Sequence, residues 1–83
     1  MRPLPLDQGA PLAAHERYPG SRLELVCGSC TWSRTYRPAR IVERLQARRL
    51  GDRQTAIAAI AHLVQWPCPG CRRMRWGSRL VAP

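Results

Sequence analysis

The sequence predicts a small α+β domain that is built around four cysteines. One observation is a pair of Cys-x-x-Cys segments, Cys27–Cys30 and Cys68–Cys71, each beside a segment that alternates like a β-strand. The other is that the 37 residues between the two pairs leave room for two helices, and residues 38–65 carry apolar stripes at helical spacing. The expected order is strand, cysteine turn, strand, two helices, cysteine turn and strand.

The chain has 83 residues, which is room for one domain. So short a domain buries only about 60% of its unfolded surface, and such domains usually need disulfides, a metal or a partner. The first residues are rich in proline and show no periodic pattern. We predict a flexible N-terminal tail over residues 1–20 and a folded domain over residues 21–80.

Three short strands are expected beside the cysteine turns. Residues 22–26 alternate and run into the first turn, and residues 31–36 can return as a second strand of a hairpin. Residues 72–76 follow the second turn and alternate well enough to form a third strand.

A first helix is predicted over residues 38–50. Pro38 suits the first position of a helix, and Gly51 suits its C-terminal stop. The apolar residues of this segment share one face at helical spacing: Ile41, Val42 and Leu45.

A second helix is predicted over residues 53–65. Asp52 or Thr55 can cap its N-terminus, and Pro67 ends it. Its apolar stripe consists of Ile57, Ile60, Ala61 and Val64. Because the connection is short, we expect the two helices to form a hairpin that packs through the two stripes.

The four cysteines predict a metal site. A Cys-x-x-Cys turn lets two thiolates approach one ion, and two such turns complete a closed tetrahedral site. The spacing between the pairs exceeds the usual fifteen to twenty residues, and the excess matches an inserted pair of helices. We predict one structural zinc ion with four ligands: Cys27, Cys30, Cys68 and Cys71.

Other uses of the cysteines depend on the compartment. The N-terminus lacks the apolar run of a signal peptide, and no segment approaches the roughly 18 apolar residues of a membrane span. The chain is therefore expected to be cytoplasmic, without membrane contact. Disulfides are rare there, so two disulfides remain only a minor alternative to a metal.

Two resemblances keep redox functions open. The segment from Trp66 to Cys71 resembles a thioredoxin-type motif, but it follows a predicted helix, whereas that motif follows a strand and opens a helix. The segments VCGSC and PCPGC together resemble the two metal-binding turns of rubredoxin, which implies an iron electron carrier. Rubredoxins are acidic and mostly lack helices, and Arg72 stands where their second turn continues with glycine.

The same two segments resemble the zinc-ribbon or double-zinc-knuckle proteins, in which each cysteine turn is flanked by short strands. This resemblance implies that the four cysteines are zinc ligands, and the helical insertion departs from the ordinary ribbon. Zinc ribbons serve both nucleic-acid binding and protein docking, so membership alone does not decide the function.

The charge favours an anionic partner. All 14 basic residues are arginine, and five acidic residues leave a formal net charge of +9. A four-thiolate zinc site contributes two negative charges, which gives about +7. Nucleic acid and acidic protein surfaces are the partners that such a field attracts.

The arginines fall into two groups. Arg37, Arg40, Arg44 and Arg48 lie within an arc of about 80° on the first predicted helix. We predict that this group binds nucleic acid, DNA rather than RNA, together with Arg34 and with the second group, Arg72, Arg73, Arg75 and Arg79. The alternative is an adaptor or inhibitor that docks on an acidic surface of a larger protein assembly.

No signature of an enzyme is present. The sequence contains no paired carboxylates, no nucleophile with a base and no glycine-rich phosphate loop, so no small-molecule substrate is expected. His15 and His62 are interpreted as surface side chains rather than as metal ligands.

Overall fold

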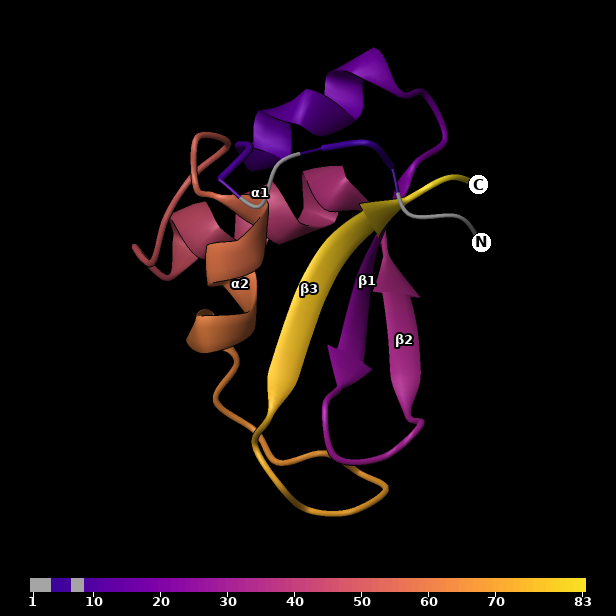
Figure 1. Cartoon of the computed structure of the whole chain (residues 1–83). Coiled ribbons are helices and arrows are strands. Elements are labelled where there is room, and N and C mark those ends of the chain that lie inside the picture. Colours follow the sequence, from indigo (N-terminus) through magenta and orange to yellow (C-terminus); the bar gives the residue numbers. More distant parts are fainter. Residues whose placement is uncertain (1–3, 7–8) are drawn as a thin grey trace.

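The structure is a computed structural model that describes residues 4–6 and 9–83. A three-stranded antiparallel sheet forms one layer, with strand order β2-β1-β3. Helices lie at the upper end of the sheet and beside β3, and the cysteine loops lie at the lower end (Figure 1). The predicted α+β class is confirmed.

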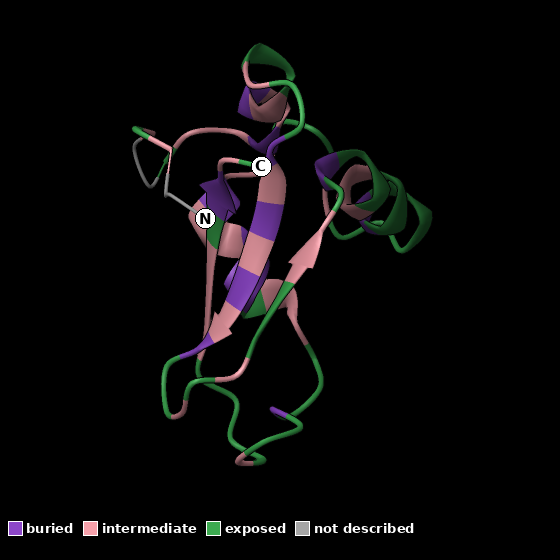
Figure 2. Cartoon of the chain, turned by 90° about the vertical axis from the view of Figure 1, so that its right-hand side faces the viewer, coloured by how far each residue is buried: buried purple, intermediate pink, exposed green. Residues whose placement is uncertain are grey.

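β1 (Arg22–Cys27) is the central strand, and its burial alternates as the sequence predicted (Figure 2). Its apolar side chains Leu23 and Leu25 are buried, together with Cys27. β2 (Ser33–Tyr36) pairs with β1 in a hairpin, which confirms the second strand.

The third strand lies further along the chain than predicted. We expected it over residues 72–76, but β3 spans Trp76–Val81. Leu80 and Val81 are buried beside β1, whereas the side chains of residues 72–75 are exposed. The apolar pair therefore decides which segment joins the sheet, and the arginine-rich segment serves as a connection.

α1 (Pro38–Ala47) begins at Pro38 as predicted but ends before residue 50. Its C-terminus is closed by Arg49, which adopts a left-handed conformation with φ 54°. The amide of Leu50 donates to the carbonyl of Leu45, and the amide of Arg49 donates to that of Gln46. This is a Schellman motif, so Arg49 rather than the predicted Gly51 occupies the position that favours glycine.

Replacing Arg49 with glycine is expected to stabilise the domain. A side chain in the left-handed region costs about 1–2 kcal/mol, and the larger unfolded-state entropy of glycine offsets about 0.5–1 kcal/mol of the gain from removing it. We expect a gain of about 0.5–1 kcal/mol, or about 3–6 °C in the unfolding midpoint measured by circular dichroism. Arg49→Ala is the matched control, because it removes the charge but keeps the Cβ. An equal gain in both variants would assign the effect to charge.

α2 (Ile57–Leu63) is shorter than the predicted 53–65 helix. The expected caps are used elsewhere, because the Oγ1 atom of Thr55 accepts from the amide of Asp52 and the Oδ1 atom of Asp52 accepts from that of Gln54. These bonds form a turn before the helix, and Ala56 stands at the N-cap without a side-chain bond. The prediction of an Asp52 or Thr55 cap is therefore wrong.

The two helices do not form the predicted hairpin that packs stripe to stripe. α2 packs along β3, and α1 contacts the N-terminal helix η1 (Leu12–Arg17). Ser78 of β3 holds α2 in place, because its Oγ atom donates to the carbonyl of Ile57 and accepts from the amide of Ala61. The stripes of both helices still enter one apolar cluster, which contains Leu12, Leu23, Leu45, Ile57, Ile60 and Leu80.

The described residues of the expected 1–20 tail lie on the domain. η1 is a 3₁₀ helix, and its Leu12 is fully buried in the apolar cluster. The preceding residue Pro11 forms a β-bridge with Ala56, and the amide of Leu4 donates to the carbonyl of Leu80. The packed unit therefore begins well before residue 21, and it extends to Val81 in β3.

Candidate metal centre

Four cysteine sulfurs meet at the end of the sheet opposite η1. Cys27 is the last residue of β1, and Cys30 lies in the loop between β1 and β2. Cys68 and Cys71 lie in the connection between α2 and β3, at the lower end of Figure 1. All four Sγ atoms lie within 4.8 Å of one another, so the four cysteines are positioned to hold a metal ion.

The distances fit a tetrahedral thiolate site. The Sγ atoms of Cys27 and Cys71 are 3.5 Å apart, and those of Cys30 and Cys68 are 3.6 Å apart. A tetrahedral ion with metal–sulfur bonds of about 2.3 Å spaces its sulfurs about 3.8 Å apart. Both spacings lie within tenths of an ångström of this value, and the remaining sulfur pairs lie within 4.8 Å.

Backbone amides of the two turns point at the sulfurs. The amide of Ser29 lies 3.4 Å from the Sγ atom of Cys27, and that of Gly70 lies 3.3 Å from the Sγ atom of Cys68. The amide of Trp32 lies 3.5 Å from the Sγ atom of Cys30. Such donors stabilise thiolates, which are the form that binds a metal.

The thiols have unequal acidities. The Ser29 amide lowers the pKa of Cys27 to about 7, although burial opposes the effect. The Trp32 amide also favours the thiolate of Cys30, but burial and the Cys68 thiol outweigh it and raise the pKa of Cys30 to about 12. Crowded sulfurs repel one another as thiolates, and a bound cation removes this obstacle to their joint ionisation.

Gly70 lies beside the sulfurs in the second turn, where a side-chain Cβ atom would still stand at ordinary van der Waals distances. A Cβ atom on Gly70 would lie 3.4 Å from the Sγ atom of Cys30 and 3.7 Å from that of Cys68. The turn ends at Arg72, which has a left-handed φ of 63° and whose amide donates to the carbonyl of Cys68. The chain thus folds tightly around the sulfurs without a glycine at position 72.

Three tryptophans pack together next to the cysteine turns. The rings of Trp32 and Trp76 meet edge to face at 5.4 Å between centroids, and those of Trp66 and Trp76 lie 6.4 Å apart. The Nε1 atom of Trp76 donates to the carbonyl of Trp66 at 2.9 Å. Tyr36 lies away from these rings, because it pairs with Leu23 at the other end of the β1–β2 hairpin.

The two histidines stand apart from the cluster. His62 is exposed on α2 and His15 lies on η1, and the metal-binding group consists of cysteines alone among residues 4–6 and 9–83. The donor set is therefore four soft sulfurs, which suits zinc or iron better than magnesium or calcium.

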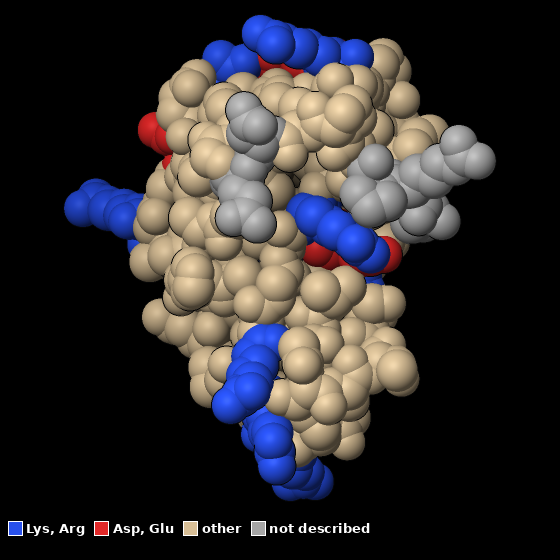
Figure 3. Space-filling model, in the orientation of Figure 1, with Lys and Arg blue, Asp and Glu red and all other residues tan. Residues whose placement is uncertain are grey.

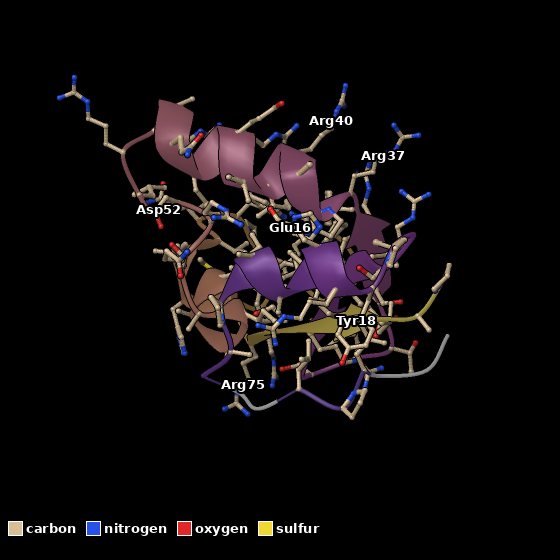
Figure 4. All side chains as sticks on the ribbon, turned by 90° about the horizontal axis from the view of Figure 1, so that it is seen from above. Glu16, Tyr18, Arg37, Arg40, Asp52 and Arg75 are labelled. Carbon is tan, nitrogen blue, oxygen red and sulfur yellow. The ribbon has the colours of Figure 1, made fainter. Side chains whose placement is uncertain are left out.

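The predicted arginines are all exposed but do not form one surface. Arg37 and Arg40 project from α1 on one side of the molecule, and Arg75 projects on the opposite side (Figure 4). Arginine side chains are scattered over the face seen in Figure 3 instead of gathering in one patch. The structure therefore separates the α1 group from the group near the second cysteine turn.

Two predicted arginines have partners within the chain. The Nη2 atom of Arg79 lies 2.6 Å from a carboxylate oxygen of Glu24 on the neighbouring strand. The guanidinium of Arg34 lies over the ring of Tyr36, 5.4 Å from its centroid. Both side chains remain accessible, but each guanidinium group already interacts with a neighbour within the chain.

The chain has no match among protein-family models, curated proteins or solved structures. No helix in the described part of the chain is long and apolar enough to cross a membrane.

Proposed function

We propose that this chain is a structural zinc module that binds nucleic acid through the arginines of α1. The observation that carries the proposal is the α1 arginine stripe, four exposed guanidinium groups on α1 and its two cap residues: Arg37, Arg40, Arg44 and Arg48. The proposed setting is the reducing cytoplasm, where the thiols stay available for metal.

Zinc is the proposed metal, because four thiolates in tetrahedral arrangement form its usual structural site. Such a site has no open position for water, so we propose no catalytic role for it. Its role is to join the loop after β1 to the loop before β3. Iron is the alternative that the same donor set allows, and a colourless protein with one zinc per chain would decide against it.

The α1 arginine stripe has the properties of a phosphate-binding surface. From Arg37 to Arg48 it extends about 16 Å, at 1.5 Å per helical residue. The ion pairs present among the described residues join Arg53 to Glu16 and Arg79 to Glu24, and neither involves α1. Each of the four guanidinium groups is therefore available for bidentate contact with a phosphate.

Removing two guanidinium groups from the α1 arginine stripe is expected to weaken nucleic-acid binding. Arg37→Ala combined with Arg40→Ala removes two phosphate contacts, so the affinity for duplex DNA should fall at least about tenfold near 0.1 M salt. The slope of log K against log salt should become less steep by about 2. Fluorescence anisotropy with duplex DNA, single-stranded DNA and RNA over a range of salt concentrations measures both quantities.

The matched control is Arg72→Ala combined with Arg73→Ala. It removes the same charge from the exposed second cysteine turn, away from the helix that carries the stripe. If binding depends on local contacts with α1, the control should lose less than about threefold in affinity. Equal losses would show that only net charge matters, and no binding at low salt would refute the proposal.

A further inference from the structure

An apolar groove runs beside the α1 arginine stripe. Its volume is about 90 Å³, and its walls come from β1, β2, α1, α2 and the segments that follow the two helices. Leu25 of β1, Ile41 of α1 and Leu63 of α2 are among the side chains that line it. Because the lining comes from parts of the chain that are far apart in sequence, no local pattern predicts this groove.

Two of the apolar residues that line the groove are exposed to solvent. Leu50 is 39% exposed and Trp66 is 41% exposed, and both line the groove. With Met74 they are the exposed large apolar residues of the described chain. Exposed apolar surface that gathers around a concave site is typical of a site for another molecule.

Two arginines give the groove a positive side. Arg44 and Arg48 also line it, and they lie one helical turn apart on α1. Neither makes an ion pair with a carboxylate among residues 4–6 and 9–83. A ligand that fits must therefore combine an apolar group for the floor with negative charge for this edge.

An acidic peptide supplies both groups. An aliphatic or aromatic side chain fills an apolar floor, and neighbouring aspartate or glutamate side chains reach the two guanidinium groups. Nucleic acid supplies the negative charge but has no aliphatic side chain for a leucine-lined floor. The shape and lining thus favour a protein ligand at this site.

We propose that this groove binds an acidic segment of a partner protein that inserts one large apolar side chain. The proposal goes beyond nucleic-acid binding, because its apolar floor has no use in contacts with phosphates. Arg44 and Arg48 belong to both surfaces, so a bound peptide and a bound nucleic acid would compete for them. The module would then exchange one ligand for the other rather than bind both at full strength.

The test uses the zinc-loaded chain and two short synthetic peptides, one of glutamate and leucine residues and one in which serine replaces every leucine. The leucine peptide should bind at least about tenfold more tightly than the serine peptide. Amide chemical-shift changes in the wild-type chain should gather at residues 41–50 and 60–66. Equal binding of the two peptides, or shifts confined to the second cysteine turn, would overturn the proposal.

Variants of the groove separate this proposal from nucleic-acid binding. Leu50→Ser should weaken leucine-peptide binding at least about fivefold and leave duplex DNA binding within about twofold. Met74→Ser is the matched control, because Met74 is exposed but does not line the groove. Arg37→Ala with Arg40→Ala should have the reverse effect, weakening DNA and sparing the peptide. Equal effects of Leu50→Ser and Met74→Ser would count against the groove.

A second copy of this chain is the other molecule that could occupy the groove, and sedimentation of the wild-type chain tests for it. The peptide proposal expects a monomer at micromolar concentration. A dimer that Leu50→Ser dissociates would mean that the groove is a self-association surface, which would overturn the proposal. A chain that binds the leucine peptide but no nucleic acid would refute the proposed function alone.

Discussion

Cys68→Ser is expected to yield a chain that neither retains metal nor folds. Cys68 is fully buried, and its Sγ atom lies 3.6 Å from that of Cys30. A serine oxygen is a poor replacement for a thiolate in a soft-ligand site, so one of the four metal ligands is lost. Structural zinc sites contribute about 10–16 kcal/mol of binding free energy, which equals or exceeds the whole stability of a small domain.

Metal analysis and near-ultraviolet circular dichroism check this expectation. Trp32, Trp66 and Trp76 pack together next to the cysteine turns. Their near-ultraviolet circular dichroism signal should therefore disappear when the metal is lost, both in Cys68→Ser and after treatment with a strong chelator. Ser29→Ala is the matched control, because the backbone amide of Ser29, and not its side chain, donates to Cys27. Metal-free protein that keeps its native spectrum would contradict a folding role for the metal.

Leu12→Ala is expected to be the most destabilising change far from the cysteines. Leu12 is fully buried between η1 and the sheet, in one cluster with Leu23, Leu45 and Leu80. Truncating a buried leucine costs about 2–5 kcal/mol, because the cavity that remains is only partly filled. In a domain of this size, a loss of about 3 kcal/mol lowers the unfolding midpoint by about 10–20 °C.

Urea unfolding of the zinc-loaded protein measures this loss. The matched control is Leu50→Ala, which makes the same truncation at a side chain that is 39% exposed. Leu50→Ala should lower the free energy of unfolding by less than about 1 kcal/mol, because the Leu50 side chain buries less apolar surface on folding than Leu12 does. Similar losses for the two variants would show that η1 contributes no core packing.

The cysteine cluster and the first hairpin could be predicted from the sequence because their signals are local. Each Cys-x-x-Cys pair forms its own turn, and the alternation from Arg22 to Cys27 directly records one buried and one exposed face. Pro38 likewise marks the start of α1 through its own fixed φ. None of these features depends on which distant segment lies next to it.

The remaining elements depend on contacts that sequence patterns do not record. Residues 72–76 alternate better than residues 76–81 do, but Leu80 and Val81 supply the apolar surface that β1 can cover. Thr55 looked like a helix cap, yet its Oγ1 atom bonds the preceding turn while its carbonyl accepts from the amide of Leu12. Tertiary partners decided both cases.

The N-terminal segment illustrates the same limit. Its prolines and lack of period are typical of a tail, and a 3₁₀ helix leaves no pattern with the α-helical period. Leu12 packs because the segment beside it forms a β-bridge from Pro11 to Ala56, which lies far along the chain. Composition alone therefore understates how much of this chain belongs to the core.

The position of β3 beside β1 has a consequence for the route of folding. These strands are neighbours in the sheet, although both helices and both cysteine loops separate them in the chain. Bringing such distant segments together costs conformational entropy before their hydrogen bonds form. A metal held by both cysteine pairs would close this span of about 40 residues into a loop. A cross-link of that length lowers the entropy of the unfolded chain, which corresponds to about 4 kcal/mol of free energy at 25 °C.

The register shows where pairing would then begin. Cys27 faces Trp76 across the two strands, directly beside the sulfurs, and Arg22 faces Val81 at the far end. Once the ion has joined the two loops, β3 can add to β1 one residue pair at a time from the Cys27–Trp76 end. The search for a distant strand thereby becomes a local extension, and the order of folding events comes to depend on the supply of metal.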